Sequence, residues 1–482
     1  MDHNRQRIVI IGGGITGLSA AYELITSASP NGPLDITLLE SSDQLGGAIQ
    51  TLRRDGFIIE KGPDSFLFRK PAVVRLCKEL GLEKDLVAMN PASSKSFIYL
   101  NKRLLPMPEG LSFGIPTRVG PFIKTDVLSI KGKARAAMDF LLPRRAAAGD
   151  ESLGSLINRR LGSEVADHLV GPVLAGIYAG DLNQLSTAAT FPQMAVMERE
   201  HRSLILGMLA SRRAAKGTKP NADLQGLPEG LRNSMFLSLR KGLMMLVEKL
   251  TDVLASSGVR IVTNCEVRRI AHVSEGYQIM TAGRDYSADR IVLAVPAEQA
   301  RAMLGEHLSD PLEEALVSVP GVSVVNVAMA FNESDIPALF KGAGFVVPRD
   351  QGLRITACTL TSQKWPHTAA PGKVLVRAYI GHSDDQQHVE EDDASLIAGA
   401  YREIAGLLSI QNEPLFSEIS RHDGSMPQYK PGHLDRIAKL EDQVAKLYPG
   451  VVLAGKSFRG VGIPDCIQQG RDAAQKLVGT AR

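Results

Sequence analysis

The amino-acid sequence predicts an α/β protein whose central parallel sheet is assembled from separated segments of the chain. Near the N-terminus, the apolar run at residues 8–11 leads into a turn with the glycine spacing G-x-G-x-x-G, and a helical pattern follows. A second apolar run, at residues 36–39, ends in Glu40. Near the C-terminus, a strand at residues 451–454, a glycine turn and a helix repeat the pattern. Together these observations indicate a Rossmann-like nucleotide-binding domain.

Each glycine of the first turn has its own role. Gly12 permits the tight turn out of the strand, Gly14 lets the backbone approach a pyrophosphate, and Gly17 lets the helix pack closely on the strand. The helix directs free N–H groups and the positive end of its dipole at the phosphates. Glu40 lies 23 residues after Gly17, near where an acidic side chain binds a ribose hydroxyl. The alternative is a glycine turn in another α/β protein, with Glu40 an ordinary surface carboxylate.

Composition narrows the class of protein. The 482 residues suffice for roughly three domains of about 150 residues. Hydrophobic residues make up 44% and the net charge is only +3, so the chain is an ordinary globular protein with no reason to bind nucleic acid. Four cysteines without a C-x-x-C pair argue against a metal site or a disulfide framework and favour the cytoplasm. The sequence predicts neither a secretory signal nor a transmembrane helix.

Local patterns along the chain predict the remaining elements. Before residue 108 they are a strand pair within 51–68, a helix over 71–80 and a hairpin of 97–100 with 103–105. After residue 225 they are strands at 235–239, 259–263 and 290–295, and then strands of an antiparallel sheet at 322–330, 344–347, 355–359 and 374–380. Residues 209–225 are expected as an exposed loop. His382 and His388 are expected to be solvent-exposed.

Residues 108–185 show helical patterns, no convincing strands and many basic side chains interleaved with apolar ones. A basic amphipathic region of this kind can lie on an anionic membrane surface. The other interpretation is the solvated face of a helical subdomain. Any membrane contact of the chain is therefore expected to be peripheral.

The order of these patterns predicts an organisation into discontinuous domains. A nucleotide-binding domain is expected from residues 1–66, 226–300 and 421–482. An α+β substrate domain is expected from residues 67–107, 186–225 and 301–420, and the helical segment 108–185 is an insertion between them. Insertion of one domain into another is common at exposed sites.

Several motifs resemble known flavoproteins. Leu45-Gly46-Gly47 resembles the second glycine pair of the amine oxidase and phytoene desaturase superfamily, which favours FAD over NAD. GPDSFLFRKP (62–71), AGIYAGD (175–181), LTSQKWPH (360–367), MPQYKPGH (426–433) and GVGIPDCIQQGR (460–471) resemble the porphyrinogen oxidases of haem synthesis, especially the type found in Gram-positive bacteria. The resemblance covers nearly the whole chain in order.

The resemblance implies an FAD-dependent oxidase of coproporphyrinogen III that forms coproporphyrin III, consumes dioxygen and releases hydrogen peroxide. The alternative substrate is protoporphyrinogen IX. Ferrochelatase or another haem-synthesis enzyme is an expected partner. Other functions left open are a different flavin oxidase, such as a monoamine oxidase, and a non-catalytic flavin-binding protein. The sequence itself demands no catalytic acid or base.

The resemblance also carries cofactor contacts over to this chain. The expected FAD-binding residues are Gly12, Gly13, Gly14, Ile15, Thr16, Gly17, Glu40, Ser41, Gly47, Ala48, Lys61, Gly62, Pro63, Asp64, Val267, His422, Val461, Gly462 and Ile463. Two of them depart from the family pattern. Ala48 stands where relatives often have Arg or Lys, and His422 stands where they often have tryptophan.

On the substrate side, Gly176, Ile177 and Tyr178 align with residues that line the porphyrinogen site in the family. Relatives hold a propionate with an arginine where this chain has Ser96. We therefore expect Lys95, Arg69 or Lys70 to supply the cation.

Overall fold

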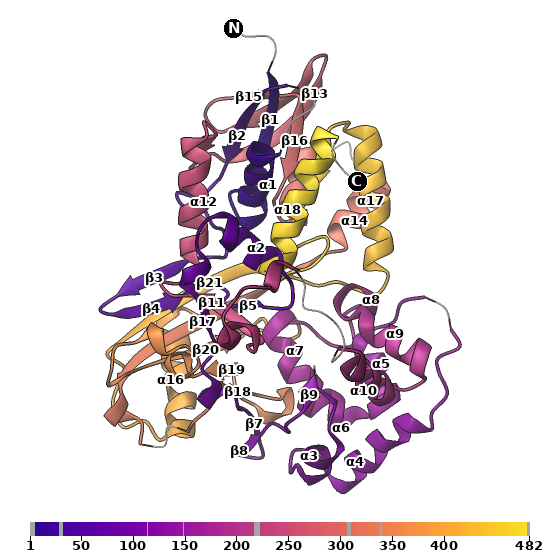
Figure 1. Cartoon of the computed structure of the whole chain (residues 1–482), viewed down its shortest axis with the longest axis vertical. Coiled ribbons are helices and arrows are strands. Elements are labelled where there is room, and N and C mark those ends of the chain that lie inside the picture. Colours follow the sequence, from indigo (N-terminus) through magenta and orange to yellow (C-terminus); the bar gives the residue numbers. More distant parts are fainter. Residues whose placement is uncertain are drawn as a thin grey trace.

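The computed structural model describes residues 5–27, 32–112, 114–147, 149–215, 222–305, 310–337 and 340–479. Its first layer is a five-stranded sheet at one end of the molecule, in which every pair of neighbouring strands is parallel (Figure 1). The strands, in spatial order, are β12 (Arg260–Val262), β2 (Leu34–Leu39), β1 (Gln6–Ile11), β16 (Arg290–Leu293) and β22 (Val451–Leu453). The predicted assembly of this sheet from distant segments is confirmed.

Helices cover this sheet, and two of them follow glycine turns. Helix α1 (Ile15–Thr26) follows β1, and α18 (Ile463–Val478) follows β22 through a loop. The two helices pack against each other. The other elements of this region are α12 (Met244–Ser256), α2 (Ala72–Glu79), α13 (Ala297–Leu304), α14 (Asp310–Val317), α17 (His433–Leu447) and an antiparallel sheet of β13 (Val267–Val273), β14 (Gly276–Thr281) and β15 (Tyr286–Ala288).

The second large sheet has seven strands and lies below the first in Figure 1. Its order is β21 (Phe416–Pro427), β17 (Gly321–Asn332), β20 (Lys373–Ile380), β19 (Ile355–Thr359), β18 (Gly344–Val346), β7 (Ser96–Leu100) and β8 (Arg103–Pro106). All pairs are antiparallel except β18 with β7. Helix α16 (Asp393–Leu408) packs on it. The four strands predicted after residue 320 are confirmed, whereas β21 was not predicted, and the expected domain boundary after residue 420 falls inside it.

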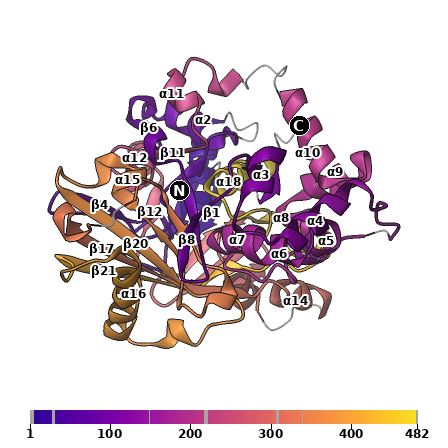
Figure 2. The ribbon, with the colours of Figure 1, turned by 90° about the horizontal axis from the view of Figure 1, so that it is seen from below.

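The third part is a helical unit beside the seven-stranded sheet, with α7 between them (Figure 2). Its helices are α3 (Val119–Lys124), α4 (Ile130–Ala137), α5 (Leu153–Leu161), α6 (Ser163–Val165), α7 (Gly171–Tyr178), α8 (Thr187–Thr190), α9 (Pro192–His201) and α10 (Leu204–Ala215). The expectation of no strands in 108–185 is wrong at one hairpin, β9 (Leu111–Ser112) with β10 (Ile115–Pro116).

The exposed loop predicted at 209–225 is also wrong in part. Helix α10 continues to Ala215, because alanine and arginine are good helix formers and its buried face packs on α9. Residues 216–221 lie outside the described part of the chain. A short 3₁₀ turn, Ala222–Leu224, follows.

Short elements join the three parts. They are the hairpin β3 (Thr51–Arg54) with β4 (Phe57–Glu60), the small sheet of β5 (Phe66–Leu67), β11 (Phe236–Leu239) and β6 (Leu86–Ala88), and the helices α11 (Glu229–Arg232) and α15 (Thr361–Lys364). The predicted hairpin of β7 and β8 is confirmed, and its turn residues Asn101 and Lys102 both have positive φ. Within the described residues, no helix is long and apolar enough to cross a membrane.

Candidate functional site

The first glycine turn forms a tight, partly open cradle at the carboxyl end of β1. Gly12 has φ +107°, a conformation that side chains disfavour. A Cβ atom on Gly17 would lie 1.9 Å from the carbonyl oxygen of Gly12, so α1 and β1 approach too closely for any other residue. A Cβ atom on Gly14 would meet nothing within 4 Å. The backbone at Gly14 therefore faces open space beside the N-terminus of α1, as a pyrophosphate site requires.

The second glycine pair lies directly against this cradle. The Gly46 N–H donates to the Gly13 carbonyl over 2.9 Å, and Gly47 has φ +57°. A Cβ atom on Gly62 would lie 1.9 Å from the Ala48 carbonyl oxygen. Three segments that sequence reasoning assigned to one cofactor are thus in contact through their backbones.

Glu40 is held in place at the carboxyl end of β2. One carboxylate oxygen accepts the Gly13 N–H over 2.6 Å, and the other accepts the Ser42 N–H over 2.9 Å. The Glu40 carbonyl accepts the N–H of Cys265, which brings the start of β13 and Val267 to the same edge. Ser41 is exposed beside it. This is the geometry expected of an acid that binds ribose next to the cradle.

The seven-stranded sheet supports the loop at 61–64 by hydrogen bonds to its backbone. The Lys61 carbonyl accepts the Asn326 side-chain amide and the His422 Nε2–H, each over 2.8 Å. The Glu60 carbonyl accepts the buried Arg377 guanidinium over 2.7 Å. His422 therefore acts here as a brace for the loop. Sequence reasoning did not identify Asn326 or Arg377, since nothing in their local pattern differs from an ordinary strand residue.

Asp64 is fixed by a buried ion pair. The Lys364 ammonium lies 2.8 Å from its carboxylate, and the Trp365 indole N–H donates to the same oxygen over 3.3 Å. Burial opposes ionisation, but Lys364 and the nearby Arg377 outweigh it and hold the pKa of Asp64 below its usual range. The LTSQKWPH motif contains Lys364 and Trp365, which is the signal that pointed to this segment.

The C-terminal glycine turn closes the site from the other side. A Cβ atom on Gly470 would lie 2.2 Å from the Thr16 carbonyl oxygen, so α18 crosses α1 in close contact. Val461 and Gly462 are half-buried, and Ile463 begins α18. The N-terminus of α18 consequently adds a second positive dipole end to the region of the cradle.

Part of the expected substrate set meets at Asp465, in the first turn of α18. The Lys70 ammonium forms an ion pair with Asp465 at 2.6 Å. Burial, with the charge of Asp465, raises the pKa of Tyr178 well above its ordinary value. Gly176 and Ile177, on the preceding turn of α7, are exposed. The motifs that contain Lys70, Tyr178 and Asp465 thus converge, and Asp465 is the member that sequence reasoning did not name.

Lys95 and Arg69 are not part of that cluster. Both side chains are exposed, and neither makes an ion pair or side-chain hydrogen bond with another residue of the described chain. Lys95 lies just before β7, where its carbonyl accepts the N–H of Ala343. These cations are therefore free to meet a charged ligand from solvent.

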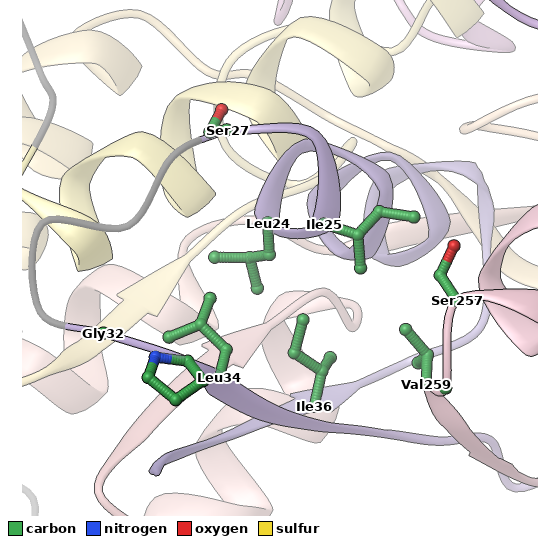
Figure 3. Close-up of a pocket in the computed structure, with 10 residues that line it drawn as sticks. Leu24, Ile25, Ser27, Gly32, Leu34, Ile36, Ser257 and Val259 are labelled. Atoms are coloured by element: carbon green, nitrogen blue, oxygen red, sulfur yellow. The ribbon is translucent and has the colours of Figure 1, made fainter. Parts of the chain in front are cut away.

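One cavity among the described residues lies outside the site. A cavity of about 300 Å³ lies between Leu24 and Ile25 of α1, Leu34 and Ile36 of β2, and Val259 (Figure 3). It sits at the amino end of β2, away from the carboxyl ends where α/β sheets bind ligands. Over the described residues, no group of three metal-ligating side chains comes together.

One expectation about histidines is wrong. His382 is 5% exposed, and its ring contacts the Arg349 guanidinium and the Asp384 carboxylate. Burial, with the charge of Arg349, lowers its pKa. The sequence suggested an exposed loop because the residues that cover His382, Arg349 and Asp384, are charged. His388 is half-buried and pairs with Glu391.

The donor set of the site fits a flavin dinucleotide. An open glycine cradle, two helix N-termini and an acid at the end of β2 lie at one edge of the parallel sheet. Its chemistry is that of pyrophosphate and ribose recognition. The loops at 45–48, 61–64 and 460–463 extend the same surface toward Tyr178 and Asp465.

Comparisons with known proteins agree with this geometry. A family model described as flavin-containing amine oxidoreductase matches residues 15–478. The chain is 42% identical over 475 residues to the coproporphyrinogen III oxidase of Bacillus subtilis, covering 98% of both chains. It is 30% identical to the human protoporphyrinogen oxidase, again over 98% of both. A crystal structure from Exiguobacterium sp. 255-15, provisionally assigned as a protoporphyrinogen oxidase, superposes with a TM-score of 0.85 at 35% identity and covers 98% of both chains.

Proposed function

The chain belongs to the flavin-containing amine oxidoreductases and uses FAD, and we propose that it oxidises coproporphyrinogen III to coproporphyrin III in haem synthesis. The observation that carries this proposal is the 42% identity to a coproporphyrinogen III oxidase over 98% of both chains, which includes the flavin half and the substrate half. The second candidate is oxidation of protoporphyrinogen IX, favoured by the 30% identity to the human enzyme.

The chemistry that FAD supplies when bound is acceptance of hydride equivalents from the porphyrinogen and their transfer to dioxygen as hydrogen peroxide. The protein's own residues bind and orient. Gly12 to Gly17 would bind the pyrophosphate, and Glu40 would bind the ribose. The braced loop at 61–64 and residues 461–463 would hold the ring system. Because the Lys61 carbonyl is tied to the seven-stranded sheet and the Asp64 carboxylate to Lys364 of α15, these two elements would fix the ring relative to the substrate.

The substrate would lie between this ring position and α7. Ile177 and Tyr178 provide apolar surface, and Lys70, Arg69 and Lys95 provide cations for propionates. Six hydrogen atoms leave the macrocycle, so three molecules of dioxygen would yield three of hydrogen peroxide per porphyrin. No side chain of this chain is assigned as a catalytic acid or base.

A side-by-side aerobic assay tests the proposal. Purified protein receives coproporphyrinogen III or protoporphyrinogen IX, while porphyrin fluorescence and peroxide are followed together. A higher kcat/KM for coproporphyrinogen is the expected result, and a preference for protoporphyrinogen selects the second candidate. Oxidation of amines alone would identify a different flavin oxidase, and bound FAD without turnover of any of these would identify a non-catalytic protein.

We also propose that the helical unit rests on a membrane surface. Five exposed apolar side chains gather on and after α3 and α4, namely Val119, Ile123, Ile130, Met138 and Leu141, of which Ile130 is 86% exposed. Exposed Arg118, Lys124 and Lys131 lie among them. Apolar side chains interleaved with cations suit an anionic bilayer surface.

Vesicle sedimentation tests this second proposal. The protein should sediment with vesicles of phosphatidylglycerol more than with phosphatidylcholine, and Ile130→Glu with Leu141→Glu should abolish the difference. If the double variant sedimented with phosphatidylglycerol vesicles as strongly as the wild type does, this surface would be ruled out. A ferrochelatase is proposed as a protein partner because it uses the porphyrin that this reaction forms, and co-purification of the two enzymes would test it.

A further inference from the structure

Lys456 occupies a central position in the proposed flavin site. It follows Gly455 at the carboxyl end of β22, and a Cβ atom on Gly455 would lie 3.8 Å from the Thr16 hydroxyl of the cradle. The Lys456 carbonyl accepts the Tyr429 hydroxyl hydrogen, and the Tyr429 oxygen in turn accepts the Gly460 N–H over 3.0 Å. The backbone at residue 456 therefore lies beside the glycine cradle and is linked through Tyr429 to the turn before α18.

The Lys456 side chain is half-buried, and it has no counter-ion among the residues that the structure describes. Burial lowers its pKa below the ordinary value for lysine. Among the residues that the structure describes, its ammonium makes no ion pair and no hydrogen bond. The neighbouring titratable groups are Cys466, whose pKa burial raises to about 11, and His422, whose pKa is lowered by burial above all. Both are neutral at pH 7, so neither provides a negative charge.

The neighbouring cations differ from Lys456 in this respect. Lys70 pairs with Asp465 and Lys364 pairs with Asp64. An ammonium that has lost part of its hydration and has no such partner is unfavourable, because the lost hydration is not replaced. An anion supplied by a ligand removes that penalty. The bound FAD carries negative charge on its pyrophosphate, and the pyrimidine side of its ring becomes electron-rich when reduced.

We propose that Lys456 is a flavin-binding residue whose ammonium is the counter-ion for a negative charge of the bound FAD. This inference rests on the flavin site proposed above. It assigns a role to a side chain that the glycine motifs alone do not identify. It also explains why a cation is retained in a half-buried position where the described part of the chain offers it no carboxylate.

The test compares Lys456→Met, Lys456→Arg and, as a control, Lys446→Met, which removes an exposed lysine from α17. Each apoprotein is titrated with FAD, and its Tm is measured with and without FAD. In Lys456→Met the Kd for FAD or the midpoint potential should change, whereas the control should match the wild type. Loss of a charge-assisted contact with FAD should raise the Kd about tenfold or more. Lys456→Arg should keep most of the wild-type behaviour.

The Tm values separate a ligand contact from a structural one. Removal of an unpaired, half-buried charge should leave the Tm of the apoprotein unchanged or higher, and it should reduce the rise in Tm caused by FAD. A lower apoprotein Tm with an unchanged FAD-induced rise would overturn the proposal, as would wild-type Kd and potential in Lys456→Met.

Two further measurements locate the contact. If Lys456 pairs with the pyrophosphate, Lys456→Met should also weaken binding of ADP-ribose. If it faces the ring, ADP-ribose affinity should be unchanged and the midpoint potential of bound FAD should fall. Wild-type protein that binds no FAD would instead remove the site proposed above, which distinguishes that failure from failure of the Lys456 assignment.

Discussion

At the scale of single residues, two buried carboxyl groups in one stretch of chain respond to their surroundings in opposite directions. Burial raises the pKa of Glu60 to about 7, although the Leu243 N–H and the Thr51 hydroxyl donate to it. Asp64, four residues later, is kept ionised by Lys364. The difference arises because Asp64 has an adjacent ammonium, whereas Glu60 has only neutral donors in contact.

Glu60→Gln should change how stability depends on pH. The folded pKa of Glu60, about 7, exceeds its ordinary value of 4.5, so its contribution is fully present below pH 4.5 and is lost as the pH rises to about 7. As the pH rises between these two values, the free energy of unfolding of the variant should therefore gain about 3 kcal/mol relative to that of the wild type. Denaturant unfolding at pH 4.5, 6 and 8 measures this. If the free energy of unfolding depended on pH in the same way in both proteins, the expectation would be contradicted.

Lys364→Met should leave the Asp64 carboxylate buried and unpaired. Loss of one partner of a buried pair costs about 3–5 kcal/mol, so Tm should fall clearly and the content of bound FAD with it. Lys373→Met is a matched control, because Lys373 bonds only the neutral Asn332 side chain. Calorimetric unfolding compares the variants, and an equal effect of both would refute the special role of the pair.

At the scale of elements, the site depends on how closely α18 approaches α1. Gly470 allows this approach, since its absent Cβ would overlap the Thr16 carbonyl. The position of the C-terminal glycine turn follows from that packing. The sequence pattern predicted both strand–turn–helix units, because glycine spacing and apolar periodicity are local. Their contact through Gly470 was not predicted, since it depends on how the two helices cross.

Gly470→Ala should force α18 away from α1, with a loss of about 1–3 kcal/mol from overpacking. Gly406→Ala in α16 is the control, because a Cβ there meets nothing within 4 Å. It should be neutral or stabilising by up to about 1 kcal/mol, since alanine favours helix. Thermal unfolding and the content of bound FAD are measured for both variants and for the wild type. A neutral Gly470→Ala would show that α18 can shift without loss.

At the scale of the whole molecule, the candidate substrate site is formed by segments that lie far apart in the sequence. Lys70 and Asp465 are 395 residues apart in sequence and form an ion pair. Tyr178, the last residue of α7 in the helical unit, comes near enough for the charge of Asp465 to raise its pKa. Recognition of the propionates is expected to reside in exposed cations, among them Lys95, which lies just before β7 and outside the Lys70–Asp465 cluster.

Lys95→Ala should raise KM for coproporphyrinogen III about three- to tenfold with little change in kcat, because an exposed cation contributes binding and not chemistry. Protoporphyrinogen IX, with two propionates in place of four, serves as the control substrate and should be affected less. Initial rates by porphyrin fluorescence measure both. An unchanged KM for coproporphyrinogen would exclude Lys95 as a propionate ligand.

The sequence by itself determined the Rossmann-like units at both ends of the chain, the hairpin at 97–105, most strands of the second sheet and the family resemblance. These features depend on the spacing of glycines and apolar residues over short stretches, and that spacing determines the local secondary structure. Only the tertiary structure decided that His382 is buried, that β21 joins the seven-stranded sheet and that Asn326 and His422 brace Lys61. It also decided that the Lys456 ammonium has no partner among the residues that the structure describes. Those properties depend on which distant surfaces pack together, and packing across hundreds of residues leaves no local pattern in the sequence.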